Sequence, residues 1–450
     1  MDIFALIPQF GGLIWTLLAF VIALSVIVAI HEYGHYIVGR CSGIHADVFS
    51  LGFGPVLYSR VDKRGTVWQI AALPFGGYVK FAGDSNAASG KDEAAMEAAQ
   101  VDPVRLRSTM HGAPLWARAA TVAAGPVFNF AMSILIFFVI ALQVGVPKEP
   151  LTVGEMRALP FEGSQLQPGD EILSVAGIPI PSTDDETAYS DAFDAVPLGQ
   201  PLDYDVMRDG QQMTVPGPYL MPTLVKQVMP QSAAYEAGLM AGDVITAIDG
   251  VPIFAFSQLK KFVEASEGRA VLLTVWREGE TLEFTMRPKV IDEPQPDGGF
   301  KSETRIGIAG GTAFDAATTT PGVFEALWGG VTNTGRIIQG SISGLKHMIV
   351  GNISTCNLSG PVGIAQTSGA MASQGAQSFI YFIAVLSTAV GLLNLFPIPA
   401  LDGGHLVFYA YEAVTGKPPS DGALRILMTI GLTLVLGLMV FALGNDIFCP

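Results

Sequence analysis

Ile30-His31-Glu32-Tyr33-Gly34-His35 ends a run that carries no charged residue from Ile3 to Ile30. The H-E-x-x-H spacing places His31 and His35 one turn apart on one face of a helix, where both imidazoles can bind one metal ion. Glu32 lies beside them and can take a proton from a metal-activated water. Such groups at the end of a membrane-length apolar helix are costly and are functional by default. The stretch predicts a metalloprotease site at a membrane; the alternative is a pair of interfacial histidines with an incidental glutamate.

The composition indicates a membrane protein. Half of the 450 residues are hydrophobic, 14% are charged and the mean hydropathy is +0.44, which is too apolar for an ordinary soluble protein. The first apolar window is too long for a signal peptide and follows Asp2 rather than a basic segment. The windows that could span a bilayer, each of about 20 residues or more, are Phe10–His35, Ala119–Val146, Ser378–Ala400 and Ile426–Asn445.

The net charge of −15 is unevenly distributed. From Gly39 to Arg118 there are 9 basic and 7 acidic residues, whereas from Pro147 to Thr320 there are 12 basic and 26 acidic residues. The positive-inside rule therefore places the first segment in the cytoplasm and the second outside, with both termini also outside. An acidic chain without a basic stripe argues against nucleic-acid binding.

The three cysteines predict no disulfide framework and no cysteine metal site. Cys41, Cys356 and Cys449 are an odd number at unrelated spacings, without a C-x-x-C pair. We expect isolated thiols.

The loop after the first window contains a predicted β-hairpin. Apolar and polar residues alternate over Val56–Arg60 and Thr66–Ala71, with a turn at Lys63–Gly65. The hairpin can present a free edge to an extended substrate, or it can simply cover the site. Residues Asp84–Asp102, rich in Ala, Ser, Asp and Glu, predict a mobile insert.

The acidic segment contains an internal repeat. Leu166–Ile172 is echoed 73 residues later by Leu239–Ile245, and Val206–Gly210 by Val275–Gly279. Each unit predicts a turn, a strand, a turn, a helix and a closing hairpin. Both units resemble PDZ domains, which bind extended peptides or chain ends by strand addition. Peptide binding, steric gating and a purely structural role remain open.

After this repeat, Ile291–Gly299 predicts a linker because it is rich in acidic residues and proline. Val323–Val350 has apolar residues at helical spacing and predicts an amphipathic helix. No charge follows from His347 to Leu401, and Asn357–Gly363 interrupts the helical pattern before the third apolar window.

The third window ends at Asn394-Leu395-Phe396-Pro397-Ile398-Pro399-Ala400-Leu401-Asp402. The two prolines open the helix and leave carbonyl groups available to a substrate. Asp402 falls at the cytoplasmic side and so at the depth of His31 and His35. Because a catalytic zinc takes three protein ligands, Asp402 is the best third ligand, with His45 and His405 as alternates.

Together these motifs resemble the site-2 protease family of intramembrane zinc metalloproteases, and within it the bacterial branch that cleaves anti-sigma factors. The resemblance rests on His31–His35, Gly125-Pro126 to Asn129, the two PDZ-like units and Asn394–Gly404, in this order. From the residues alone, Gly125 to Asn129 indicates close helix packing, with support of the site as the alternative.

The resemblance implies a site-2-type zinc metalloendopeptidase of the bacterial inner membrane, active near the cytoplasmic face. Zn²⁺ would be bound by His31, His35 and Asp402, with Glu32 as the general base and Asn394 and Pro397 along the substrate. Its partners would be single-span membrane proteins in the bilayer, such as an anti-sigma factor already cut outside, remnant signal peptides, and peptides or substrate ends at the PDZ domains. No nucleic acid is expected.

We therefore expect a multi-pass α-helical membrane protein with four transmembrane helices, a membrane-associated β-hairpin and two extracytoplasmic α+β PDZ domains. Two other functional classes stay open: a PDZ-based receptor or chaperone with an inert metal site, and, less favoured because no inverted repeat is evident, a zinc-regulated transporter. The predicted domains are 1–38 (first span with the zinc motif), 39–115 (cytoplasmic loop), 116–146 (second span), 150–222 and 223–290 (PDZ domains), 291–377 (linker and amphipathic helix), 378–407 (third span) and 423–446 (fourth span).

Overall fold

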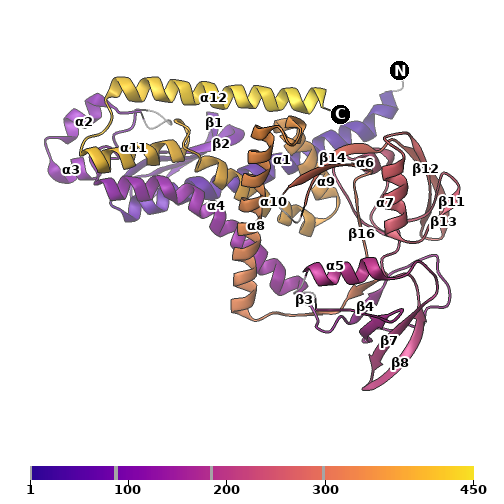
Figure 1. Ribbon diagram of the computed structural model, residues 1–450. Helices are drawn as coiled ribbons and strands as arrows, with labels where there is room; N and C mark the ends of the chain where they lie inside the picture. Colours follow the sequence, from indigo (N-terminus) through magenta and orange to yellow (C-terminus); the bar gives the residue numbers. More distant parts are fainter. Residues whose placement is uncertain (1–2, 86–89, 183–185, 296–298, 450) are drawn as a thin grey trace. The chain divides into compact units, whose positions relative to one another are not determined.

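The computed structural model describes residues 3–85, 90–182, 186–295 and 299–449 (Figure 1). The chain divides into two compact units. The helical unit contains residues 3–139, 326–346 and 355–449, and the strand-rich unit contains residues 140–325 and 347–354.

Among the described residues, four helices are long and apolar enough to cross a membrane, as the sequence predicts. They are α1 (Ile3–Cys41), α4 (Leu115–Val144), α10 (Ala376–Asn394) and α12 (Asp421–Phe448). The predicted amphipathic helix is α8 (Val323–Val350). The other helices of the unit are α2 (Glu93–Ala99), α3 (Pro103–Arg107), the 3₁₀ helix η1 (Thr355–Asn357), α9 (Pro361–Ser373) and α11 (Asp402–Thr415).

Small and hydroxyl-bearing residues join α4 to α10. The Ser133 hydroxyl donates to the carbonyl of Ala384 at 2.8 Å, and the Ser387 hydroxyl donates to the carbonyl of Asn129 at 3.0 Å. In a membrane the lipid is as apolar as the side chains, so close packing and hydrogen bonds of this kind associate helices.

The sequence did not predict α2 within the supposed mobile insert. Asp92 accepts a hydrogen bond from the backbone N–H of Ala95 at 3.0 Å and so caps the helix. Met96 and Ala99 are buried. The interpretation of Asp84–Asp102 as mobile is therefore wrong for α2, while residues 86–89 lie outside the described part of the chain.

The predicted hairpin is confirmed but is longer than expected. β1 (Ala46–Val61) and β2 (Val67–Phe81) each bend and pair twice, giving four strand segments in one antiparallel sheet. The bend in β1 falls at Gly52 and Gly54, whose φ angles of 89° and 85° favour glycine. The order across the sheet is 77–81, 46–51, 67–71 and 56–61.

The strand-rich unit contains two four-stranded sheets of the same order, one from each sequence repeat. Each module follows the predicted order of strand, turn, helix and closing hairpin. The first has β5 (Glu171–Val175), β6 (Ile178–Pro179), α5 (Glu186–Ala195), β7 (Leu202–Arg208) and β8 (Gln211–Gly217). The second has β10 (Val244–Ile248), β11 (Val251–Pro252), α7 (Phe256–Ala265), β12 (Val271–Arg277) and β13 (Glu280–Met286), preceded by the short helix α6 (Ala233–Ala237), which the sequence did not predict.

The two repeated sequence segments supply the two partners of one ion pair in each module. In the first module Arg208 donates to both carboxylate oxygens of Asp170 at 2.6 and 2.7 Å. In the second module Arg277 does the same to Asp243 at 2.6 and 2.7 Å. Both carboxylates are buried, so each bidentate pair fixes a turn to a hairpin.

The start of the predicted linker at Ile291–Gly299 is instead a strand of a hairpin, while residues 296–298 lie outside the described part of the chain. Glu293 is not a free charge there, because Arg305 donates to both of its carboxylate oxygens at 2.8 Å. The chain then returns and adds one strand to each module, which the sequence did not predict. The hairpin is β14 (Lys289–Pro294) with β15 (Phe300–Arg305), and the return pairs are β16 (Ile308–Gly310) with β9 (Val225–Val228), β17 (Phe314–Ala316) with β4 (Val153–Met156), and β18 (Thr318–Thr319) with β3 (Val146–Pro147).

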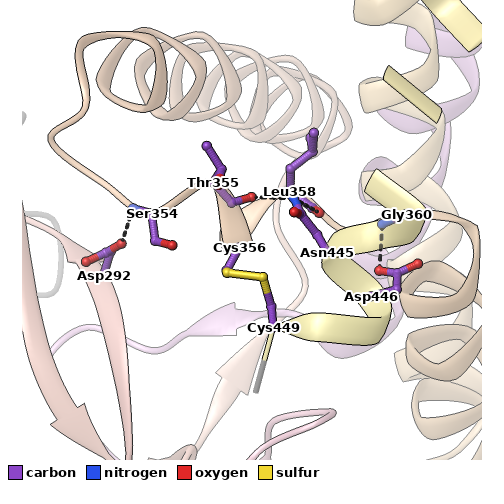
Figure 2. The surroundings of a disulfide bond; sticks show 9 residues. All are labelled: Asp292, Ser354, Thr355, Cys356, Leu358, Gly360, Asn445, Asp446 and Cys449. Atoms are coloured by element: carbon purple, nitrogen blue, oxygen red, sulfur yellow. Dashed lines mark hydrogen bonds between the residues drawn. A yellow bond between two sulfur atoms is a disulfide. The ribbon is translucent and has the colours of Figure 1, made fainter. Parts of the chain in front are cut away.

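The expectation of isolated thiols is wrong for two of the three cysteines. Cys356 in η1 and Cys449 after α12 form a disulfide across 93 residues, and Figure 2 shows its surroundings. Asp446 accepts hydrogen bonds from three N–H groups at the start of α9, at 2.8 to 3.0 Å. The sequence could not reveal the pair, because spacing alone does not show which segments meet. Cys41 is a free, exposed cysteine.

The disulfide predicts the number of reactive thiols. In protein denatured without reductant, a maleimide reagent should label only Cys41, whereas after reduction it should label all three cysteines. Mass spectrometry of the intact chain gives the count. The Cys41→Ser variant is the control and should show no labelling before reduction. Labelling of Cys356 or Cys449 in the unreduced wild-type chain would contradict the disulfide.

Candidate metal centre

Helix α1 supplies the first two candidate ligands. His31 and His35 lie one turn apart, and their Nε2 atoms are 3.1 Å from one another. His31 is buried, and Glu32 is half-buried beside them. The structure therefore places the H-E-x-x-H residues on α1 as the spacing predicts, with both Nε2 atoms aimed at one point.

Asp402 reaches the same point from the first turn of α11. Its Oδ2 atom lies 3.1 Å from Nε2 of His31 and 3.5 Å from Nε2 of His35. Among the described residues, these three form the one group of His, Cys, Asp or Glu side chains arranged to hold a metal ion. The chain thus brings together ligand atoms from residues far apart in the sequence.

The loop before Asp402 is shaped by two glycines. α10 ends at Asn394, and Leu401 precedes the first turn of α11. A Cβ atom on Gly403 would lie 2.3 Å from the carbonyl oxygen of Leu395, and one on Gly404 would lie 2.4 Å from that of Ile398. Only residues without a side chain let the loop fold this closely against the start of α11.

Neighbouring groups on α4 orient both imidazoles. Nδ1 of His35 lies 2.9 Å from the carbonyl oxygen of Thr121, so Nδ1 carries the proton and Nε2 is free to bind a metal. The Asn129 side-chain amide lies 3.3 Å from Nδ1 of His31, and its Oδ1 atom is buried without a partner. Turning this amide to present Oδ1 would let it accept the Nδ1 proton, leaving Nε2 of His31 free as well.

Gly125 explains how α4 comes so close to the two histidines. A Cβ atom there would lie 2.4 Å from Nε2 of His35 and 2.8 Å from Cε1 of His31. The favoured interpretation of Gly125 to Asn129 as structural packing is therefore incomplete, since this turn also contacts the site. The sequence signal was an apolar span with a glycine and an asparagine four residues apart.

The residues fit a zinc ion. Ligands at about 2.1 Å in a tetrahedral site lie about 3.4 Å from one another, close to the three observed separations. The buried Oδ2 atom of Asp402 also has no hydrogen-bond donor. A carboxylate oxygen in that position needs a cation or a donor. Two histidines and one carboxylate are a common catalytic zinc set.

The alternate ligands named from the sequence lie outside this group. His45 directly precedes β1 and is half-buried, with Nε2 3.7 Å from a carboxylate oxygen of Asp47. His405 follows Asp402 on α11 but is not among the three converging residues. Asn394 donates from Nδ2 to the carbonyl of Val390 at 3.1 Å, and Pro397 is exposed in the loop.

The sheet of β1 and β2 lies against α1 near Glu32. A Cβ atom on Gly77 would lie 3.2 Å from Cγ of Glu32, and the backbone N–H of Val79 interacts with the Glu32 carboxylate. The strand segment 77–81 therefore contacts the Glu32 side chain on the side that faces the sheet and limits its orientation.

Comparisons with known proteins show the family to which the chain is similar. The model of Peptidase family M50 matches residues 19–438. A protein of Agrobacterium fabrum with the provisional name zinc metalloprotease Atu1380 is 36% identical over 445 residues, covering 97% of each chain. The regulator of sigma-E protease RseP of Escherichia coli is 33% identical, covering 96% of this chain and 98% of that protein.

A solved structure also matches part of the chain. The solution structure of GtR34C from Geobacillus thermodenitrificans is 34% identical and covers 17% of this chain and 84% of that one. Its TM-score is 0.14, so it supports no comparison of folds.

The contact at Gly125 predicts a loss of metal. In the Gly125→Ala variant the added methyl group would displace both histidines, so the zinc content of the purified protein should fall about tenfold or more. Elemental analysis of detergent-purified protein measures it. The control is Gly437→Ala on α12, where a Cβ atom meets nothing within 4 Å. Wild-type zinc content in Gly125→Ala would refute this role.

Proposed function

The chain belongs to peptidase family M50 and is a metalloprotease of the site-2 type, and we propose that it hydrolyses peptide bonds within the transmembrane segments of single-span membrane proteins. The observation that carries this proposal is the meeting of His31, His35 and Asp402 at the end of an apolar helix, with Glu32 beside them.

We assign each residue of the centre one role. His31, His35 and Asp402 hold the zinc ion, which supplies Lewis acidity to the attacking water and the scissile carbonyl. Glu32 takes the proton of the water and returns it to the leaving amine. Thr121 holds the orientation of His35 through its carbonyl group.

The substrate must unwind before it can react. A transmembrane helix keeps its amides in internal hydrogen bonds, so a scissile bond becomes accessible only where that helix opens. The loop from Leu395 to Leu401 interrupts the helical structure directly before Asp402. We assign Asn394 and Pro397 to contacts with the unwound segment. For Asn394 this requires releasing its bond to Val390.

Substrate selection falls to the two modules of the strand-rich unit, which we interpret as PDZ domains at 150–222 and 223–290. The relative from Escherichia coli is named a regulator of sigma-E protease. We propose an anti-sigma factor whose outer domain has already been removed as the substrate, with remnant signal peptides as a second class. The PDZ domains would bind the new chain end or exclude a large outer domain.

The disulfide supports the membrane orientation predicted from charge. Disulfides persist in oxidising compartments such as the bacterial periplasm. Cys449 follows the C-terminal end of α12, whereas Asp421 begins it. We place the C-terminus and the strand-rich unit in the periplasm and the metal centre near the cytoplasmic face of the inner membrane.

Glu32→Gln tests the proposed chemistry. Co-expression of the wild-type chain with a tagged, pre-trimmed anti-sigma factor should give a cleavage product, because Glu32 can accept the proton of the water. The Glu32→Gln variant should lower the cleavage rate by about 10² to 10⁴ while keeping its zinc. Immunoblotting and elemental analysis measure the two quantities. A product formed equally by both chains would mean that Glu32 is not the base.

Cysteine labelling tests the orientation. In a Cys41→Ser background, Val290→Cys and Val101→Cys each add one thiol at a well-exposed position. A membrane-impermeant maleimide applied to spheroplasts should label Val290→Cys only, and after lysis it should label both variants. Labelling of Val101→Cys in sealed spheroplasts would invert the proposed topology.

A further inference from the structure

Asp62 joins the tip of the hairpin to helix α1. Its Oδ1 atom accepts the backbone N–H groups of Arg64 and Thr66, at 2.8 and 3.0 Å, and so shapes the turn between β1 and β2. Its Oδ2 atom faces three side chains, the Tyr36 hydroxyl at 3.2 Å, Arg40 at 3.3 Å and the Trp68 indole at 3.4 Å. One oxygen of this carboxylate therefore binds the turn, and the other binds two side chains of α1 and one of β2.

The helix residues involved lie directly after the metal ligands. Tyr36 follows His35 in the sequence, and Arg40 lies about one turn further on and also donates to the Tyr36 hydroxyl. Tyr36 is buried and packs edge-on against the Trp68 ring at 5.0 Å. The turn of the sheet is therefore attached to the part of α1 that carries His35.

A single row of paired residues then crosses the sheet from this attachment to Glu32. Trp68 pairs with Phe49, and Phe49 pairs with Val79 on the next strand segment. The rings of Trp68 and Phe49 lie 4.3 Å apart. Val79 presents its backbone N–H to the Glu32 carboxylate. Asp62 thus contacts one end of this row and Glu32 of α1 contacts the other.

We propose that Asp62 is a positioning residue for the peptidase centre, which sets the sheet against α1 so that strand segment 77–81 orients Glu32. This inference rests on the proposed role of Glu32 as the general base. A displacement of the sheet would move the group that contacts Glu32, while His31, His35 and Asp402 are held by α4 and α11 and would keep their metal.

The charge state of Asp62 agrees with this role. Burial by itself would raise the pKa of this carboxyl group, but the hydrogen bonds from Arg64, Thr66, Trp68 and Tyr36 outweigh that effect and lower its pKa to about 2. Asp62 is therefore ionised at neutral pH and can hold the Arg40 guanidinium and two neutral donors together.

The variant Asp62→Asn keeps the acceptor at Oδ1 and replaces Oδ2 with a donor. Oδ1 still accepts the turn amides, whereas an NH₂ group now faces the three donors of Tyr36, Arg40 and Trp68. With detergent-purified protein and the pre-trimmed anti-sigma factor, kcat should fall about tenfold or more. KM should stay within about threefold, because ground-state binding is not affected. Zinc content should equal that of the wild type.

Arg40→Gln provides the partner variant and Asp47→Asn the matched control. The double variant of Asp62→Asn with Arg40→Gln should be no slower than Asp62→Asn alone, since Asp62→Asn already removes the interaction with Arg40. Asp47 lies on β1 with an exposed side chain whose carboxylate is 3.7 Å from His45, so its variant should keep the wild-type kcat. If Asp62→Asn does not fold, Tyr36→Phe replaces it and should also lower kcat.

Wild-type kcat in Asp62→Asn or in its replacement would overturn the inference. A change in KM alone would overturn it as well, because it would indicate contact with the substrate, and loss of zinc would indicate a purely structural role. Cleavage by the wild type that slows by about 10² to 10⁴ in Glu32→Gln shows that the proposed function stands in each of these cases. Without cleavage by the wild type, the proposed function fails and the inference with it.

Discussion

The structure depends on bringing one carboxylate to two histidines in a largely buried place. The Asp402 Oδ2 atom has no donor of its own, so its position is favourable only with a cation between it and the Nε2 atoms of His31 and His35. Removing either histidine would weaken the binding of the cation and leave the negative charge of Asp402 without compensation. We therefore expect zinc binding at this centre to be coupled to the local fold of α1, α4 and α11.

Close backbone approach is what makes this arrangement possible. Gly34 packs against the carbonyl of Ala124, where a Cβ atom would lie 2.5 Å from the oxygen. Gly125, one residue later on α4, makes room for the two imidazoles. Gly403 and Gly404 admit the loop that precedes α11. In each case the side chain is absent where two backbones or a backbone and a ligand must touch, which is the usual solution for helices packed in lipid.

Much of this could be predicted from the sequence because the signals are local or chemically strong. An uncharged run ending in H-E-x-x-H predicts α1, and the first charge after a long apolar tract singles out Asp402. The repeat predicts the order of elements in each module, although not that Arg208 and Arg277 would bind the two repeated aspartates.

The features that the sequence did not predict depend on contacts between distant segments. The Cys356–Cys449 disulfide, the strands that return to each module and the contact of Asn129 with His31 leave no periodic pattern in the chain. The sequence failed to predict the hairpin after the second module for another reason. Its acidic residues suggested a solvated linker, and only the position of Arg305 shows that Glu293 is paired.

Helix α12 has none of the candidate ligands, yet it contacts the loop that leads to Asp402. A Cβ atom on Gly431 would lie 1.5 Å from the carbonyl oxygen of Pro399, so helix and loop are in direct contact there. The other end of α12 is held by the Cys449 disulfide and by Asp446, which binds the start of α9. A helix is stiff over this distance of about 27 Å. The same stiff helix therefore joins the Cys449 disulfide at its end to the loop at Pro399, which leads to Asp402.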